Sequence, residues 1–200
     1  MRIIAGAHKG RRIPFNNKRF GNARVTSDFV KEAVFGSLGV DLVGKRLLDL
    51  FAGSGQIGLE AVSRGATAWM NDRDKKRASF IRDLVTEWQL EASVTLTTDD
   101  WRKLLGRLEG QDRFDLVYVD PPYDARTPSD VFLSEACLTT ISESSVLSPG
   151  GRLYVQHDRR TELPEAVGNL MCFKRRRYGD SLLSTYEIQQ SSGQSDDATH

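Results

Sequence analysis

From Lys45 onward, short apolar runs of the sequence alternate with segments that carry a helical spacing of apolar residues. The runs typical of strands are 46–51, 67–71, 93–97, 114–119 and 152–156. The segments typical of helices are 56–65, 75–89, 100–108 and 129–142. Such alternation requires parallel strands joined by right-handed crossovers, with helices on both faces of the sheet. The sequence therefore predicts an α/β fold around one open, Rossmann-like sheet.

Two later apolar runs predict how this sheet ends. Residues 170–178 and 182–188 are separated only by Gly-Asp-Ser. So short a link joins antiparallel strands, so we expect a hairpin at the sheet edge. Residues 191–200 lack periodicity and are predicted to be a disordered tail. The main domain is predicted to span 41–190.

The first 40 residues have a different character, and we predict an extension and helix packed on the main domain, because they are too few for a core of their own. Residues 1–27 hold basic side chains and no acidic one. The segment 27–38 predicts a helix, with Ser27 as N-cap. The formal net charge of the whole chain is only +1, so any nucleic acid binding depends on a local patch such as this one.

Composition excludes several classes of protein. Cys137 and Cys172 are the only cysteines, each beside apolar residues, and the three histidines are scattered. We therefore predict two small buried hydrophobes, no disulfide framework and no metal site. No apolar run approaches membrane length, so we expect a soluble, cytoplasmic protein.

A glycine-rich turn follows the first of these strands. "LLDLFAGSGQIG" places Gly53, Gly55 and Gly58 between a predicted strand and a predicted helix, which is the context of a nucleotide-binding turn. Asp72 closes the next strand, where an acidic side chain accepts hydrogen bonds from ribose hydroxyls. The alternative is a tight turn with a surface acid, which leaves the strand–turn–helix context and Asp72 without a common purpose.

NAD and S-adenosylmethionine both bind turns of this kind. Asp49 lies inside the strand, four residues before Gly53, where its charge would repel a pyrophosphate. A cofactor with a sulfonium and an ammonium group would be attracted to the same carboxylate. Asp49 therefore favours S-adenosylmethionine, with NAD still open.

The strand 114–119 ends in Asp120-Pro121-Pro122-Tyr123. Proline has no N–H, so this backbone offers fixed carbonyl oxygens, and an ionised Asp120 only accepts hydrogen bonds. Acceptors beside the Tyr123 ring suit a planar base that carries an amino group. They would hold the two amino hydrogens, localise the nitrogen lone pair and aim it at a methyl donor at the same sheet edge. The motif thus predicts methyl transfer to an exocyclic amine.

Together these residues resemble those of the S-adenosylmethionine-dependent methyltransferases of the RsmD type, which methylate N2 of one guanine in bacterial 16S rRNA. The resemblance rests on "RIIAGAHKGRRI", "RVTSDFVKEAVFGSL", "LDLFAGSGQIGLEAVSRGA" and "DPPY". It implies a seven-stranded class I methyltransferase sheet with the edge hairpin. It also implies that Asp100 and Trp101 meet the adenine of the cofactor, with Asp99 an alternative to Asp100.

The same resemblance assigns the partner. Small-subunit rRNA, free or in the 30S particle, would be the substrate of a monomeric enzyme. The basic character of the first 27 residues predicts that Lys9, Arg11, Arg12 and Arg24 hold its phosphates. The acceptor cluster of Asp120 alone fits guanine N2 and adenine N6 equally, so an adenine-N6 DNA methyltransferase is the main alternative. Against it, no sizeable target-recognition region remains outside the catalytic fold. A NAD-linked oxidoreductase gives Asp-Pro-Pro-Tyr no role, and a non-catalytic RNA-binding module needs no glycine turn.

Overall fold

The computed structural model describes residues 1–16, 20, 28–36, 38–39, 41–111 and 113–189. The predicted tail and Arg24 therefore lie outside the described residues, as does Ser27. The helices are α1 (Asp28–Gly36), α2 (Gln56–Ser63), α3 (Lys75–Glu87), α4 (Trp101–Leu108) and α5 (Leu133–Ser142). The strands are β1 (Arg46–Asp49), β2 (Thr67–Asn71), β3 (Val94–Thr97), β4 (Phe114–Val119), β5 (Leu147–Asp158), β6 (Ala166–Val167), β7 (Leu170–Tyr178) and β8 (Ser181–Ile188).

These strands form one mixed sheet. Within the described ranges it has eight strands in the order β3-β2-β1-β4-β5-β8-β7-β6, with β1 to β5 parallel. The predicted hairpin is confirmed, because β7 and β8 pair antiparallel across a turn at Gly179, whose φ is +62°. The expected number of seven strands is wrong. The extra strand, β6, has two residues paired with β7, too few to give a periodic pattern.

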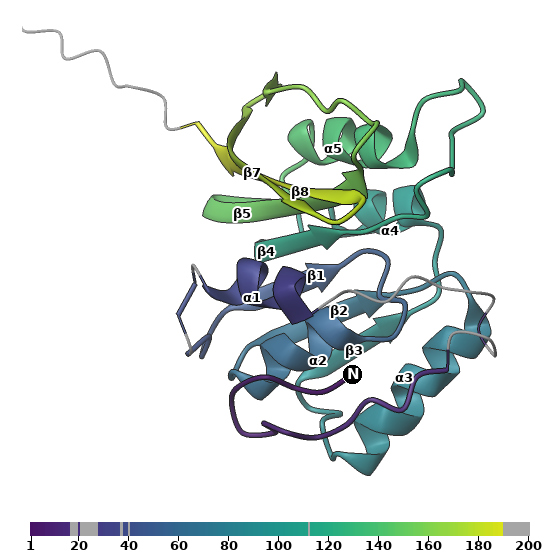
Figure 1. Cartoon of the computed structure of the whole chain (residues 1–200), viewed down its shortest axis with the longest axis vertical. Coiled ribbons are helices and arrows are strands. Elements are labelled where there is room, and N and C mark those ends of the chain that lie inside the picture. Colours follow the sequence, from purple (N-terminus) through teal and green to yellow (C-terminus); the bar gives the residue numbers. More distant parts are fainter. Residues whose placement is uncertain (17–19, 21–27, 37, 40, 112, 190–200) are drawn as a thin grey trace, which may run out of the picture.

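Helices cover both faces of the sheet, as predicted (Figure 1). The alternation of side chains along β1 shows why, since Leu47 joins the cluster under α1, α2 and α3 while Leu48 joins the cluster under α4 and α5. Both leucines are almost completely buried. Because β1, β2, β4 and β5 supply side chains to the two clusters in alternation, the parallel part of the sheet is apolar on both faces and fixes its own register.

The N-terminal hairpin, residues 1–13, packs on α2. Ile3 and Ile13 are 1% and 2% exposed and belong to the core cluster. The two strands of the hairpin meet where the Ile3 N–H donates to Arg11 O and the Ile13 N–H donates to Met1 O, each at 3.0 Å. Gly6 has a φ of +84°, and a Cβ there would lie 1.8 Å from Ser63 O, so only glycine allows this close approach.

The segment between β4 and α5 differs from its prediction. The helix expected from residue 129 begins at Leu133. The preceding residues form a loop in which Arg126 and Phe132 make an isolated antiparallel bridge and Asp130 has a φ of +61°. The chain turns back here before the helix begins, and it thereby places Phe132 beside Arg126.

Candidate active site

Three of the predicted carboxylates meet at the carboxyl edge of the parallel strands. Asp49 ends β1, Asp72 follows β2 and Asp120 follows β4, and β1 pairs with both other strands. Asp49 lies opposite Tyr118 in the register, two residues before Asp120. This edge is where an open α/β sheet binds ligands.

The glycine turn leads directly into α2. Gly53 and Gly55 have φ values of +54° and +76°, which L side chains rarely adopt, and Gly55 is the N-cap of the helix. Gly58 serves packing instead, because a Cβ there would lie 2.2 Å from the sulfur of Met70 on β2. The helix therefore sits close to the sheet, and its N-terminus faces the carboxyl edge.

Asp49 is 1% exposed, and its Oδ1 atom accepts no hydrogen bond. The backbone N–H groups of Phe51 and Gly58 donate to the carboxylate. Burial, followed by the charges of Asp120 and Asp72, raises the pKa of Asp49 to about 8. A buried acid with an unused oxygen, beside the glycine turn, is suited to a cationic or hydrogen-donating ligand group.

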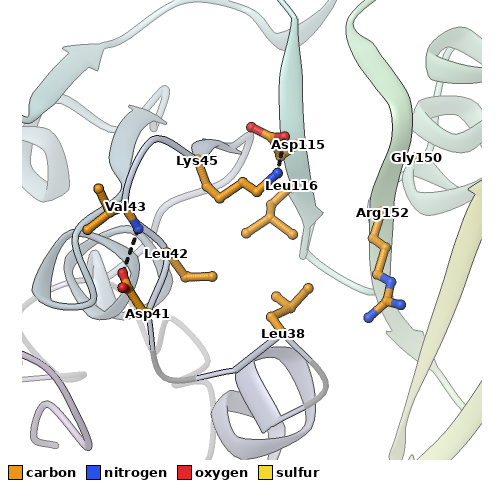
Figure 2. Close-up of a pocket in the computed structure, with 9 residues that line it drawn as sticks. All are labelled: Leu38, Asp41, Leu42, Val43, Lys45, Asp115, Leu116, Gly150 and Arg152. Carbon is orange, nitrogen blue, oxygen red and sulfur yellow. Dashed lines mark hydrogen bonds and ion pairs between the residues drawn. The ribbon is translucent and has the colours of Figure 1, made fainter.

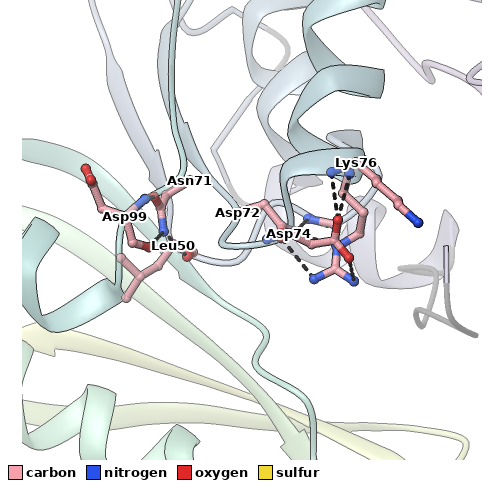
Figure 3. A network of polar contacts seen from close by, with 8 residues as sticks. Leu50, Asn71, Asp72, Asp74, Lys76 and Asp99 are labelled. Atoms are coloured by element: carbon pink, nitrogen blue, oxygen red, sulfur yellow. Dashed lines mark hydrogen bonds and ion pairs between the residues drawn. The ribbon is translucent and has the colours of Figure 1, made fainter.

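Asp72 has a full set of partners within the protein (Figure 3). Its Oδ2 accepts from Gly53 N at 2.8 Å and from Arg77 Nε at 2.9 Å, and its Oδ1 accepts from Asp74 N at 2.8 Å and from Arg77 Nη2 at 2.9 Å. A carboxylate has about four lone-pair positions, so these bonds use them all. Ribose hydroxyls can reach Asp72 only by displacing Arg77.

Asp99 and Asp100 both engage protein groups. Asp100 Oδ1 caps α4 by accepting from Arg102 N at 3.0 Å, and Asp99 Oδ2 pairs with Arg107 Nη2 at 2.8 Å. Asn71 holds this segment, since its Oδ1 accepts from Asp99 N at 3.0 Å and its Nδ2 donates to Asp99 O at 3.2 Å (Figure 3). Trp101 is only 6% exposed, with Arg102 Cζ 4.4 Å from its ring centroid. The contact of Asp100 and Trp101 with adenine stays a prediction.

The Asp-Pro-Pro-Tyr segment follows β4 as predicted, but fewer of its hydrogen-bond acceptors are available to a ligand than expected. Asp120 is half-buried and Pro121 is buried. Pro122 O already accepts from Ala125 N at 3.0 Å, so the turn uses that carbonyl. Tyr123 is 8% exposed, and its hydroxyl accepts from Gln156 Nε2 at 2.9 Å.

Gln156 was not predicted, although it lies near the carboxyl end of β5, the parallel neighbour of β4. Its Oε1 accepts from the Tyr118 hydroxyl at 2.5 Å while its Nε2 donates to Tyr123. The sequence held one signal for this role, since Gln156 is a polar residue that follows an apolar run, near the end of the strand that faces the site. The chain Tyr118–Gln156–Tyr123 fixes the ring of Tyr123 from inside the protein.

Three of the four predicted phosphate-binding side chains lie elsewhere, and the fourth, Arg24, is outside the described residues. Lys9, Arg11 and Arg12 are exposed on the N-terminal hairpin. Arg11 Cζ lies 5.3 Å from the ring centroid of Trp88, directly after α3. α3 follows the carboxyl end of β2 and precedes the amino end of β3 (Figure 1), so Arg11, at the end of this helix, lies at the sheet edge opposite Asp120. The structure therefore brings together the residues expected around the cofactor and the target, and not the described cations of the N-terminal hairpin.

A cavity of about 410 Å³ opens at the amino edge of the sheet, away from the carboxylates (Figure 2). Two of the residues that line this cavity show where it lies. Lys45 directly precedes β1, and Asp115, with which it pairs at 3.0 Å, is the second residue of β4. The cavity is separated from Asp49 and Asp120 by the length of those strands, and it is not part of the candidate site.

Further observations concern metal sites, membrane-spanning helices and the two cysteines. Among the residues that the structure describes, no group of three or more His, Cys, Asp or Glu side chains is arranged to hold a metal ion. Within the same ranges, no helix combines the length and the apolarity needed to cross a membrane. Cys137 is buried and Cys172, on β7, is half-buried, so the expectation that both are buried is wrong for Cys172. Both are described residues, and neither forms a disulfide.

Comparison with known proteins shows that a family model and individual relatives match most of this chain. A family described as "Conserved hypothetical protein 95" matches residues 1–187. The chain is 33% identical over 189 residues to the Bacillus subtilis protein named "Putative rRNA methyltransferase YlbH", covering 94% of this chain and 98% of that protein. It is 31% identical over 161 residues to "Ribosomal RNA small subunit methyltransferase D" of Haemophilus influenzae, covering 80% and 79%.

The fold also matches solved structures. One is an RNA methyltransferase from Salinibacter ruber in complex with S-adenosyl-L-homocysteine, with a TM-score of 0.60 and 17% identity. The match covers 84% of this chain and 95% of that one. At this identity the likeness shows the fold alone, and it confirms the predicted methyltransferase-type sheet.

Proposed function

This chain belongs to the RsmD-type methyltransferase family, described as "Conserved hypothetical protein 95", and from that membership we propose the reaction that it catalyses. It transfers a methyl group from S-adenosylmethionine to the exocyclic N2 amine of one guanine in 16S rRNA. The substrate is the rRNA or the 30S particle in the cytoplasm, and the enzyme acts as a monomer. The observation that carries the proposal is the meeting of Asp49, the glycine turn and Asp120-Pro-Pro-Tyr123 at one sheet edge.

The residues present fit the cofactor. The unpartnered, buried Oδ1 of Asp49 suits a cation or an N–H donor, and the turn at Gly53 and Gly55 leaves room for close approach. S-adenosylmethionine supplies a methyl group on a positively charged sulfur. Asp49 would hold its charged end and Asp72 its ribose, after Arg77 has moved away. Asp100 and Trp101 would meet its adenine.

On the substrate side, Asp120 and the carbonyl of Pro121 would accept the two amino hydrogens, while Tyr123 stacks on the base. Held in this way, the amino nitrogen points its lone pair toward the methyl donor, and Asp120 stabilises the positive charge that develops on it. Gln156 acts as a positioning residue, because its hydrogen bond to Tyr123 fixes the stacking ring. The preference for guanine N2 over adenine N6 rests on the family resemblance.

The decisive experiment is methyl transfer from labelled S-adenosylmethionine to undermethylated small ribosomal subunits, free 16S rRNA and duplex DNA, followed by nucleoside analysis. We expect N2-methylguanosine from a ribosomal substrate. N6-methyladenine from DNA would replace the proposed substrate by that of an adenine-N6 DNA methyltransferase. No label on any substrate, with no cofactor bound, would refute the methyltransferase proposal.

We expect cofactor binding to release close to one proton at about pH 7. In the free protein Asp49 has a pKa of about 8, so it is mostly protonated there. A cationic ligand favours the ionised form and lowers that pKa, so affinity rises by up to about tenfold per pH unit and levels off above pH 8. Calorimetry in buffers of different ionisation enthalpy measures the released proton. Asp49→Asn should remove the pH dependence, and a flat wild-type profile would contradict the assignment.

We expect Gln156→Leu to reduce kcat/KM for the RNA by roughly tenfold. This factor corresponds to the upper end of the free energy that a neutral hydrogen bond contributes. The leucine leaves the hydroxyls of Tyr118 and Tyr123 without their shared partner. Gln156→Glu should restore most of the activity, because a carboxylate accepts from both hydroxyls. Cofactor affinity should not change in either variant. Equal losses in the Leu and Glu variants would rule out this positioning role.

A further inference from the structure

A second cavity lies directly beside the Asp-Pro-Pro-Tyr segment. It has a volume of about 310 Å³, within the usual size range of ligand sites, and we call it the Arg126 cavity. Its walls come from the loop after β4 and from the end of β5, and they include Tyr123, Asp124, Arg126, Phe132, Asp158 and Arg160. Neither Asp120 nor any residue of the glycine turn lines it. Tyr123 is thus the wall that the cavity shares with the target site.

One side of the Arg126 cavity is a flat stacking surface. Arg126 Cζ lies 3.8 Å from the ring centroid of Phe132, and the two residues are paired as a β-bridge. Arg126 Nη1 donates to Asp130 O at 2.7 Å, which holds the guanidinium in place, while 41% of the side chain stays exposed. Unstacked RNA bases bind to aromatic rings and to guanidinium planes in this manner.

A second arginine stands at the mouth of the cavity. Arg160 Nε and Nη2 donate to the two oxygens of Asp158, at 2.8 and 3.1 Å, and 74% of the Arg160 side chain is exposed. A guanidinium has five N–H donors, and this pair uses two of them. Asp130 pairs with Arg126 at 3.4 Å and Asp158 pairs with Arg160 at 2.8 Å, so a ligand would be recognised by directed N–H donors and stacking rather than by net charge.

We propose that the Arg126 cavity binds the RNA nucleotide adjacent to the target guanosine. The base of that nucleotide stacks on Arg126 and Phe132, and its phosphate accepts from Arg160. The proposal rests on the proposed function and adds the substrate contacts that the remote Lys9, Arg11 and Arg12 do not provide near Asp120. A base flipped toward Tyr123 pulls its neighbour along the strand, and the shared wall places that neighbour in the cavity.

The test uses the full-length chain and undermethylated small subunits. We expect Phe132→Ala and Arg126→Ala each to raise KM for the substrate roughly tenfold, the effect of losing one stacked base, with kcat and cofactor affinity nearly unchanged. Arg160→Ala should also raise KM and should reduce the salt dependence of binding by about one phosphate, whereas Phe132→Ala should leave that slope unchanged. The matched control is Arg113→Ala, an exposed arginine at the amino end of β4, which should match the wild type.

Equilibrium binding of a 16S rRNA transcript, measured with S-adenosylhomocysteine present, separates this inference from the proposed function. If the wild-type chain transfers no methyl group to RNA but the three variants bind the transcript more weakly, the proposed function fails and the cavity remains an RNA site. If methyl transfer is observed and the variants behave like Arg113→Ala in both assays, the cavity is not a nucleotide site. Melting temperatures equal to that of the wild type exclude misfolding as the cause of weaker binding.

Discussion

Replacement of Asp120 by alanine is expected to lower kcat for methyl transfer by at least about 100-fold, the usual cost of removing one group that stabilises transition-state charge. Asp120 is proposed to hold an amino hydrogen and to stabilise the charge that develops on nitrogen. RNA affinity should be largely kept. Cofactor binding should be kept as well, because Asp120 contributes a negative charge that opposes ionisation of Asp49. Single-turnover rates and separate binding constants measure these quantities.

Asp120→Asn keeps an acceptor oxygen and loses the charge, so its rate should lie between those of the wild type and Asp120→Ala. Glu91→Ala removes an exposed carboxylate at the opposite edge of the sheet and serves as the control. A kcat for Asp120→Ala within a few fold of the control would mean that the segment closes a strand and has no part in the chemistry.

The second large effect concerns stability, at the buried ion pair of α2. Glu60 is 0% exposed, and its Oε1 accepts from Arg64 Nε at 3.0 Å and Nη2 at 2.9 Å. The same carboxylate accepts from Ile4 N at 2.8 Å and from Ala5 N at 3.1 Å. Glu60→Ala leaves two backbone donors without their acceptor and the buried guanidinium without its ion-pair partner, with only the bond from Arg64 Nη1 to Gly39 O, at 3.3 Å, kept among the described contacts. We expect a loss of about 3–5 kcal/mol in the free energy of unfolding, measured by denaturant titration.

At this chain length, such a loss lowers Tm by roughly 6–20 °C. Glu87→Ala, on the exposed surface of α3, should change stability by less than about 0.5 kcal/mol. Glu60→Gln keeps an acceptor for the N-terminal backbone and should lose less than Glu60→Ala. Stability of Glu60→Ala within about 1 kcal/mol of the wild type would show that the N-terminal hairpin contributes little to the folded state.

The order of strands and helices was predictable because it depends on local patterns. Each parallel strand is a short apolar run, and the link at Gly179 is too short for anything but a hairpin. Strand β6 and the late start of α5 at Leu133 were missed, since a two-residue strand and a loop with one bridge leave no periodic pattern. Both features depend on tertiary pairing. Strand β6 pairs with β7, and the residues before α5 are held by the bridge between Arg126 and Phe132.

The site was predictable to the extent that topology alone places it. Asp49, Asp72 and Asp120 had to meet because parallel strands end at a common edge. Side-chain partners were not predictable in this way. The bonds from Arg77 to Asp72 and from Gln156 to Tyr123 depend on helix orientation and sheet register. The sequence shows that its first residues are basic, but composition does not show where in the fold these side chains lie. In the structure Arg11 lies at the end of α3.

The docking of the N-terminal hairpin has a consequence for how the chain folds during its synthesis. Ile3 and Ile13 leave the ribosome before α2, yet the acceptor for Ile4 N is the Glu60 side chain, 56 residues later. Until α2 has emerged, the nascent hairpin has neither its hydrogen-bond acceptors nor an apolar surface to cover. The hairpin is therefore expected to become protected from hydrogen exchange only once α2 has formed, well after its own residues have been synthesised.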